Sequence, residues 1–183
     1  AEYIDVGRAK FFATTTRNTV TNLQTATESV MIWDTVEADA GFNHISSGSD
    51  ITLDEAGDYF VFLNVPIAGI GSVDRQAPKM MLKLDGTPIP GAEAKQGYIR
   101  ASAEGNDYAS LHYFGLISTT SSNQVLSVGS IRESAAGGTV LVQSGKVGSL
   151  YIEKIDASSN VYKGSGTTLE GGAANWNPSV ASS

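Results

Sequence analysis

The side chains that could do chemistry in this sequence are few and widely spaced. The two histidines, His44 and His112, lie 68 positions apart, and neither has a metal ligand at i±2 or i±4. His112 stands in an apolar run, which favours a histidine satisfied in a core or an interface. We therefore predict no catalytic residue and no metal site, and we expect that the chain is not an enzyme.

Acidic side chains gather around the first loops, at Asp34, Asp39, Asp50, Asp54 and Asp58. Carboxylate oxygens suit calcium, but short acidic side chains also cap turns, and we favour the second interpretation. Nothing in the spacing of the 19 acidic residues selects a pair for glycoside hydrolysis. No cofactor is predicted.

Two tryptophans and two glycine-bearing stretches are the remaining features that could mark a ligand site. Trp33 and Trp176 could stack on sugar rings, but we favour a core position for Trp33 and an anchoring role for Trp176. Residues 69–72 and 164–166 lack the strand–turn–helix context of a nucleophile elbow or a phosphate loop. We interpret both stretches as plain loops.

Composition restricts the class of partner. The chain has 183 residues, 41% hydrophobic and 17% charged, with a net charge of −7, which suits one domain with a sizeable core. No basic stripe is present, so no nucleic-acid partner is expected. There is no cysteine and no Asn-X-Ser/Thr sequon, which favours assembly in a reducing, unglycosylated compartment. No apolar run is long enough to span a bilayer and no signal-peptide pattern is found, so no membrane partner is expected.

Short apolar runs separated by turn signals predict an antiparallel β sandwich, because helical periodicity is almost absent. We predict strands at 9–13, 30–36, 51–53, 57–66, 79–84, 110–118, 124–131, 139–143 and 149–155. Connections are expected at 14–27, 39–50, 67–76 and 88–106. Asp85-Gly86 is a strong hairpin-turn pair.

The run 57–66 is the strand around which the others are arranged. Successive side chains of a strand point to opposite faces, so Tyr59, Val61, Leu63 and Val65 share one face. Phe60, Phe62, Asn64 and Pro66 share the other, and both faces are largely apolar. One face is expected to meet a second sheet and the other a second subunit. Pro66 is expected to end the strand.

From residue 158 onward Gly, Ser, Thr, Ala and Asn dominate, which is typical of a flexible arm. The predicted organisation is an N-terminal arm at 1–8, a sandwich domain at 9–155 and a C-terminal arm at 156–183. Trp176 and Val180 are the candidate anchors of the C-terminal arm, held either by an assembly contact or on the chain's own domain.

The order of several residues resembles the signature of the complement C1q/tumour necrosis factor superfamily. The matching residues are Trp33, Asp34, Val36, Gly41, Phe42, Gly48, Ile51, Gly57, Tyr59, Phe60 and Phe62, followed by 82–86, 113–115, 124–127 and 148–155. The resemblance covers about residues 9–155. It implies a jelly roll that assembles as a three-fold bundle, with Phe60, Phe62, Asn64 and Tyr113 at the trimer interface.

Three functions compete. The first is a homotrimeric structural virion protein, such as a phage capsid decoration (cement) protein that binds major capsid or other virion proteins after assembly in the host cytoplasm. The second is an extracellular C1q-like module that recognises a protein or glycan, including a tail-fibre receptor. The third is an enzyme on a jelly roll, for which no acid pair or histidine cluster is found. We favour the first.

Overall fold

The computed structural model describes residues 8–14, 22–38, 41–70, 76–95, 107–133 and 138–155, and every regular element within these ranges is a β-strand. The strands are β1 (Arg8–Thr14), β2 (Ser29–Val30), β3 (Thr35–Ala38), β4 (Phe42–His44), β5 (Ile51–Leu53), β6 (Gly57–Ile70), β7 (Pro78–Leu84), β8 (Thr87–Lys95), β9 (Tyr108–Thr119), β10 (Gln124–Arg132), β11 (Thr139–Val142) and β12 (Val147–Ile155). Within these ranges no helix is long and apolar enough to cross a membrane. The predicted arms lie outside the described residues, except that Arg8 begins β1.

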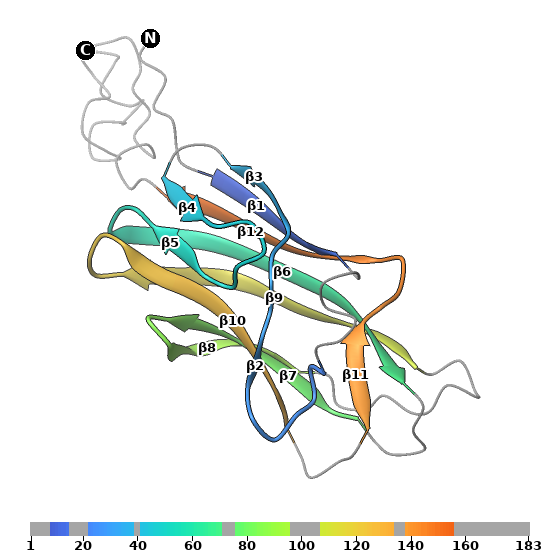
Figure 1. Ribbon diagram of the computed structural model, residues 1–183. Coiled ribbons are helices and arrows are strands. Elements are labelled where there is room, and N and C mark those ends of the chain that lie inside the picture. The colour runs from blue at the N-terminus through green and yellow to red at the C-terminus, as the bar shows by residue number, and fades with distance from the viewer. Residues whose placement is uncertain are drawn as a thin grey trace, which may run out of the picture.

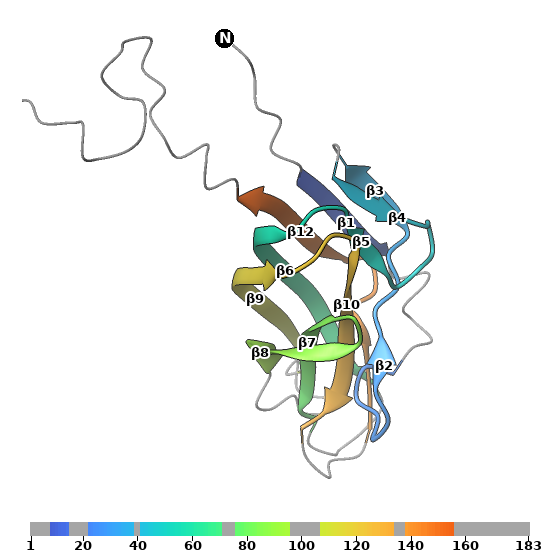
Figure 2. The same cartoon turned by 90° about the vertical axis from the view of Figure 1, so that its left-hand side faces the viewer.

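Two antiparallel sheets lie face to face, as the sequence predicted (Figures 1 and 2). In the first, the β6 sheet, β9 pairs along one edge of β6, so β12 and β11 share its other edge, and β1 and β3 follow β12. In the second, the β10 sheet, the order is β4-β5-β10-β7-β8, and β2 also pairs with β10. The edge strands β8 and β9 come close to each other where the two sheets meet.

Strand β6 has the two faces that its alternation predicts. Tyr59, Val61, Leu63 and Val65 are all buried in the core between the sheets, while Phe62 is exposed on the opposite side. The predicted core position of Trp33 is confirmed as well, because its side chain is fully buried. The central strand therefore separates a filled core from an uncovered outer face.

Pro66 does not end β6, contrary to the prediction. The strand continues to Ile70 and stays paired with β9 as far as Ala68. Pro66 lies between Asn64, the last residue paired at that end of β12, and Ile67, the first paired with β11. A missing N–H is tolerated there because the neighbouring strand changes at that point.

The predicted strand at 30–36 is also wrong, since the chain crosses from one sheet to the other within it. β2 pairs with β10, whereas β3 pairs with β1. Between them Trp33 makes an isolated bridge to Gly48. The stretch 30–36 is therefore a crossing between the two sheets and not one strand.

Three predicted connections contain regular structure. β4 lies within 39–50, the end of β6 within 67–76, and most of β8 within 88–106. In the predicted connection at 14–27, Leu23 and Gln24 are buried. The Gln24 side-chain oxygen accepts a 2.5 Å hydrogen bond from the Ala77 amide. This contact ties the segment across one end of the sandwich.

The hairpin between β7 and β8 turns at Asp85 and Gly86, as predicted. Both residues have positive φ, 48° and 78°, as a tight turn of this kind requires. The Asp85 carboxylate accepts hydrogen bonds from the Val125 amide (2.8 Å) and the Gln124 side chain (2.7 Å). The bond from the Val125 amide, and to a smaller extent the bond from Gln124, lowers the pKa of Asp85 below its ordinary value.

We expect Asp85 to make the fold acid-sensitive. Because its folded pKa is lowered, its stabilising effect is complete above the ordinary Asp pKa of about 3.9 and is lost as the pH falls through the folded value. Asp85→Asn preserves the turn, because Asn-Gly suits the same turn type. In this variant the urea midpoint of unfolding should fall less than in the wild type between pH 6 and pH 2.5. Some pH dependence of the urea midpoint should remain in the variant, because Lys95 and Lys79 also lower the pKa of Glu133. Identical slopes in the two proteins would contradict this account.

Candidate functional site

The outer face of β6 and β9 carries a group of exposed apolar side chains. Phe62 lies opposite Phe114 in the strand register, and Phe60 lies opposite Leu116. Phe62, Phe114 and Leu116 are 40%, 70% and 61% exposed. The rings of Phe60 and Phe114 meet edge to face, with centroids 4.8 Å apart. We call these four residues the aromatic patch.

No described element covers the aromatic patch, and polar pairs border it. His112 Nδ1 lies 3.1 Å from the Asn64 side-chain oxygen on one side. On the other side Ser118 donates a 2.5 Å hydrogen bond to Asp58. An apolar centre with a polar border is the arrangement of a protein–protein contact surface.

On the neighbouring strand β12, Tyr151 lies in register with Phe62 and Glu153 with Phe60, so both belong to the same outer face. The Tyr151 hydroxyl donates a 2.7 Å hydrogen bond to the Glu153 carboxylate. The apolar centre of the face is therefore bounded by polar groups on the β12 side too.

Tyr113 does not share the face of Phe60 and Phe62, so its predicted place beside them is corrected. It alternates with the exposed residues of β9 and packs against the core. Its hydroxyl lies over Gly115, where a Cβ would come within 2.3 Å of it. Burial raises the pKa of this hydroxyl. The residue on the outer face is Phe114, which the two-residue alternation from buried Leu111 could have identified.

The other sequence candidates for chemistry have structural roles or fall outside the described chain. The two ring nitrogens of His44 lie 2.8 Å from the Asp50 carbonyl oxygen and 3.2 Å from the Trp33 carbonyl oxygen, so this histidine stabilises the loop after β4. Because Trp33 is fully buried, its ring cannot stack on a sugar. Among the described residues, no three His, Cys, Asp or Glu side chains gather as metal ligands do. Asp39, Trp176 and Val180 lie outside the described residues.

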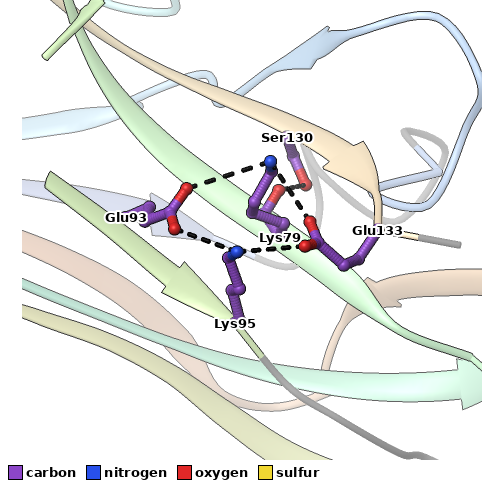
Figure 3. A network of polar contacts seen from close by, with 5 residues as sticks. All are labelled: Lys79, Glu93, Lys95, Ser130 and Glu133. Atoms are coloured by element: carbon purple, nitrogen blue, oxygen red, sulfur yellow. Dashed lines mark hydrogen bonds and ion pairs between the residues drawn. The ribbon is translucent and has the colours of Figure 1, made fainter. Parts of the chain in front are cut away.

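Four charged side chains form a closed ring on the β10 sheet (Figure 3). Lys79 Nζ lies 3.8 Å from Glu93 and 3.1 Å from Glu133, and Lys95 Nζ lies 3.0 Å from each of the same two carboxylates. The hydrogen bonds to Glu133 and then Glu93 raise the pKa of Lys95. Each charge faces two opposite charges, so this ring fastens β8 and the end of β10 to β7 and leaves no group poised to react.

The fold defines the class of the protein as an all-β antiparallel jelly roll. No protein-family model and no curated protein matches the chain. Among solved structures it is similar to murine APRIL, a jelly roll of the tumour necrosis factor family. The pH 8.0 crystal structure of murine APRIL is 11% identical, with a TM-score of 0.54 over 82% of this chain and 100% of that chain. The pH 8.5 structure is 11% identical, with a TM-score of 0.51 over 81% and 99%. The likeness shows a tumour necrosis factor-like fold.

Proposed function

We propose that this chain is a non-enzymatic structural protein that assembles as a homotrimer through the aromatic patch. The observation that carries the proposal is the exposure of Phe62, Phe114 and Leu116 on a sheet whose other face is already filled. A contiguous exposed apolar group of this kind marks an interaction surface. Three-fold assembly is what the superfamily resemblance implies for such a face.

The aromatic patch supplies part of the energy of assembly. Fully burying one large apolar side chain is worth about 1.5–3 kcal/mol, and Phe62, Phe114 and Leu116 are 40%, 70% and 61% exposed in the single chain. Covering them in three copies therefore gains about 8–15 kcal/mol. Association costs on the order of 4–15 kcal/mol in lost freedom, so contacts around the patch must contribute as well. An apolar interface of this kind is typical of permanent oligomers.

Within this proposal the trimer is a virion component, a decoration protein that binds and stabilises a phage shell. The absence of cysteine and sequons, the sparse charge and the net charge of −7 support it. The arms at 1–8 and 156–183 would extend over adjacent subunits, with Trp176 and Val180 as anchors. Segments of this composition order on binding and can bridge several partners.

A second candidate is an extracellular recognition or adhesion module that binds a protein or glycan through its loops. The tumour necrosis factor-like fold that the chain shares with murine APRIL supports it. The two candidates share the trimer and differ in what the trimer binds.

The first test is the mass of the purified chain by light scattering, which we expect to be three times that of one chain. The second is co-sedimentation with phage shells that lack the protein. Truncation after Ile155 should leave the trimer intact and weaken shell binding at least tenfold. A truncated trimer that binds shells as tightly as the full chain excludes the gripping role of the C-terminal arm. A monomeric full chain excludes the whole proposal.

A further inference from the structure

The pair His112 and Asn64 lies between two exposed apolar groups on the same outer face. On β9, Phe114 follows His112 by two residues, and Tyr108, 58% exposed, precedes it by four. On β6, Phe62 precedes Asn64, and Ile70, 48% exposed, follows it. Since β6 and β9 lie side by side (Figures 1 and 2), a subunit that covers both apolar groups also covers the polar pair.

The hydrogen bond of this pair decides where a proton can bind. The Asn64 side-chain oxygen can only accept, so His112 Nδ1 carries the hydrogen across the 3.1 Å contact. Nε2 is then the free nitrogen of the neutral ring. A second proton bound there gives the ring a positive charge and a further N–H that needs an acceptor.

The described surroundings hold no carboxylate to balance such a charge. We call residues that pair across neighbouring strands a row. The row of His112 contains Asn64 of β6 and Ser149 of β12. Towards one end of β9 the next outward groups are Ser110 of β9 and Pro66 of β6, and beyond them Tyr108 of β9, Ala68 of β6 and Leu141 of β11. None of these residues is a carboxylate, and the one ionisable group among them is the Tyr108 phenol.

The carboxylates and the other ionisable groups of this face lie towards its other end. Glu153 and Tyr151 of β12 bond each other, and Glu153 is in the row of Leu116, four residues along β9 from His112. At about 3.3 Å per residue that row is about 13 Å away. Asp58, bonded to Ser118, is farther still, in a row six residues from His112. Arg8 and Lys10 of β1 pair with Glu153 and Tyr151, and Glu37 of β3 pairs with Lys10, so these three positions also lie towards that end.

We propose that protonation of His112 opens the trimer, so that assembly is stable at pH 8 and is lost towards pH 5.5. The inference rests on the proposed homotrimer and adds its regulation. The three-fold symmetry that assembles the aromatic patch brings three copies of His112 to one level of the seam. Three imidazolium groups there would repel one another and lose water, with no carboxylate beside them.

The direction of the effect follows from linkage. If the trimer excludes protons that the separate chains can take up, acid favours the separate chains. An imidazole ordinarily changes charge between about pH 5 and 8. Three protons taken up per trimer opened make the association constant fall by up to about a thousandfold per pH unit. Asp and Glu ordinarily titrate near pH 4, below this window.

The experiment is sedimentation equilibrium of the purified chain at pH 8.0, 7.0, 6.0 and 5.5 and constant ionic strength, with His112→Asn beside the wild type. We expect a wild-type trimer at pH 8.0 and at least a hundredfold weaker association at pH 5.5. His112→Asn keeps a side chain that can bond Asn64 and removes the titrating group, so its association should be unchanged across the range. Far-UV circular dichroism at each pH shows whether both proteins stay folded.

Each outcome decides a different point. A wild-type trimer unchanged at pH 5.5 overturns the inference and leaves the trimer standing. Acid dissociation in His112→Asn equal to that of the wild type also overturns it, since His44 is the other histidine of the chain. A wild-type chain that is monomeric at pH 8.0 overturns the proposed function itself. If His112→Asn fails to fold, the wild-type slope of the association constant against pH decides, because a slope near zero contradicts the inference.

Discussion

Phe62→Asp should convert the trimer into a folded monomer. Phe62 is exposed on the outer face of β6 in the single chain, so an aspartate there meets water and costs the fold little. In the trimer the same change removes three rings that are each 40% exposed in the single chain, a loss of about 2–4 kcal/mol of interface burial, and it adds three carboxylates to an apolar seam. Light scattering at micromolar concentration should report one chain mass, with an unchanged far-UV circular dichroism spectrum.

A matched control shows whether the effect depends on where the aspartate is introduced or only on replacing an exposed apolar side chain with aspartate. Ile45 is 80% exposed in the loop between β4 and β5, away from the aromatic patch. Ile45→Asp makes the same kind of change and should leave the trimer intact, whereas Phe114→Asp should dissociate it as Phe62→Asp does. A Phe62→Asp protein that still sediments as a trimer would show that the assembly uses a different surface.

Leu63→Ala should destabilise the fold without removing the assembly surface. Leu63 follows Phe62 along β6, but its side chain is buried in the core between the two sheets. Truncating a buried leucine to alanine costs about 2–5 kcal/mol. The urea midpoint should fall accordingly, while the protein that remains folded still forms trimers.

The comparison with Phe62→Ala tests the two faces of β6 directly. Phe62→Ala should weaken association and leave the unfolding of the single chain nearly unchanged, measured in the monomeric Phe114→Asp background. The opposite result, with Leu63→Ala affecting only association, would mean that the faces have been exchanged.

The parts of the fold that the sequence predicted are those with a local physical cause. The alternation from Tyr59 to Val65 sets which side chains enter the core, because successive residues of a strand point to opposite faces. Asp85-Gly86 predicted its hairpin because few residue pairs tolerate positive φ twice. These signals lie within a few residues, so they can be read without knowing the partner strands.

The errors arose where the cause lies elsewhere in the chain. Nothing near Trp33 shows that β2 and β3 join different sheets, because that depends on strands far away. The polar, glycine-bearing composition of 88–106 suggested a connection, yet an edge strand such as β8 tolerates such residues, prolines included. The position of Tyr113 was inferred from a family resemblance when the buried residues of its own strand indicate the opposite face. The aromatic patch was therefore half predicted, through Phe60 and Phe62.

The pairing of β1 with β12 has a consequence for how the chain folds. Arg8 lies opposite Glu153, 145 positions later, so the first and last described strands meet only when nearly all of the chain between them is present. Pairings between such distant positions make folding slow, and a growing chain exposes the unpaired edge of β6 until β12 leaves the ribosome. This sheet is thus expected to be completed only once β12 has been synthesised, and until then its exposed strand edges make the chain prone to aggregate.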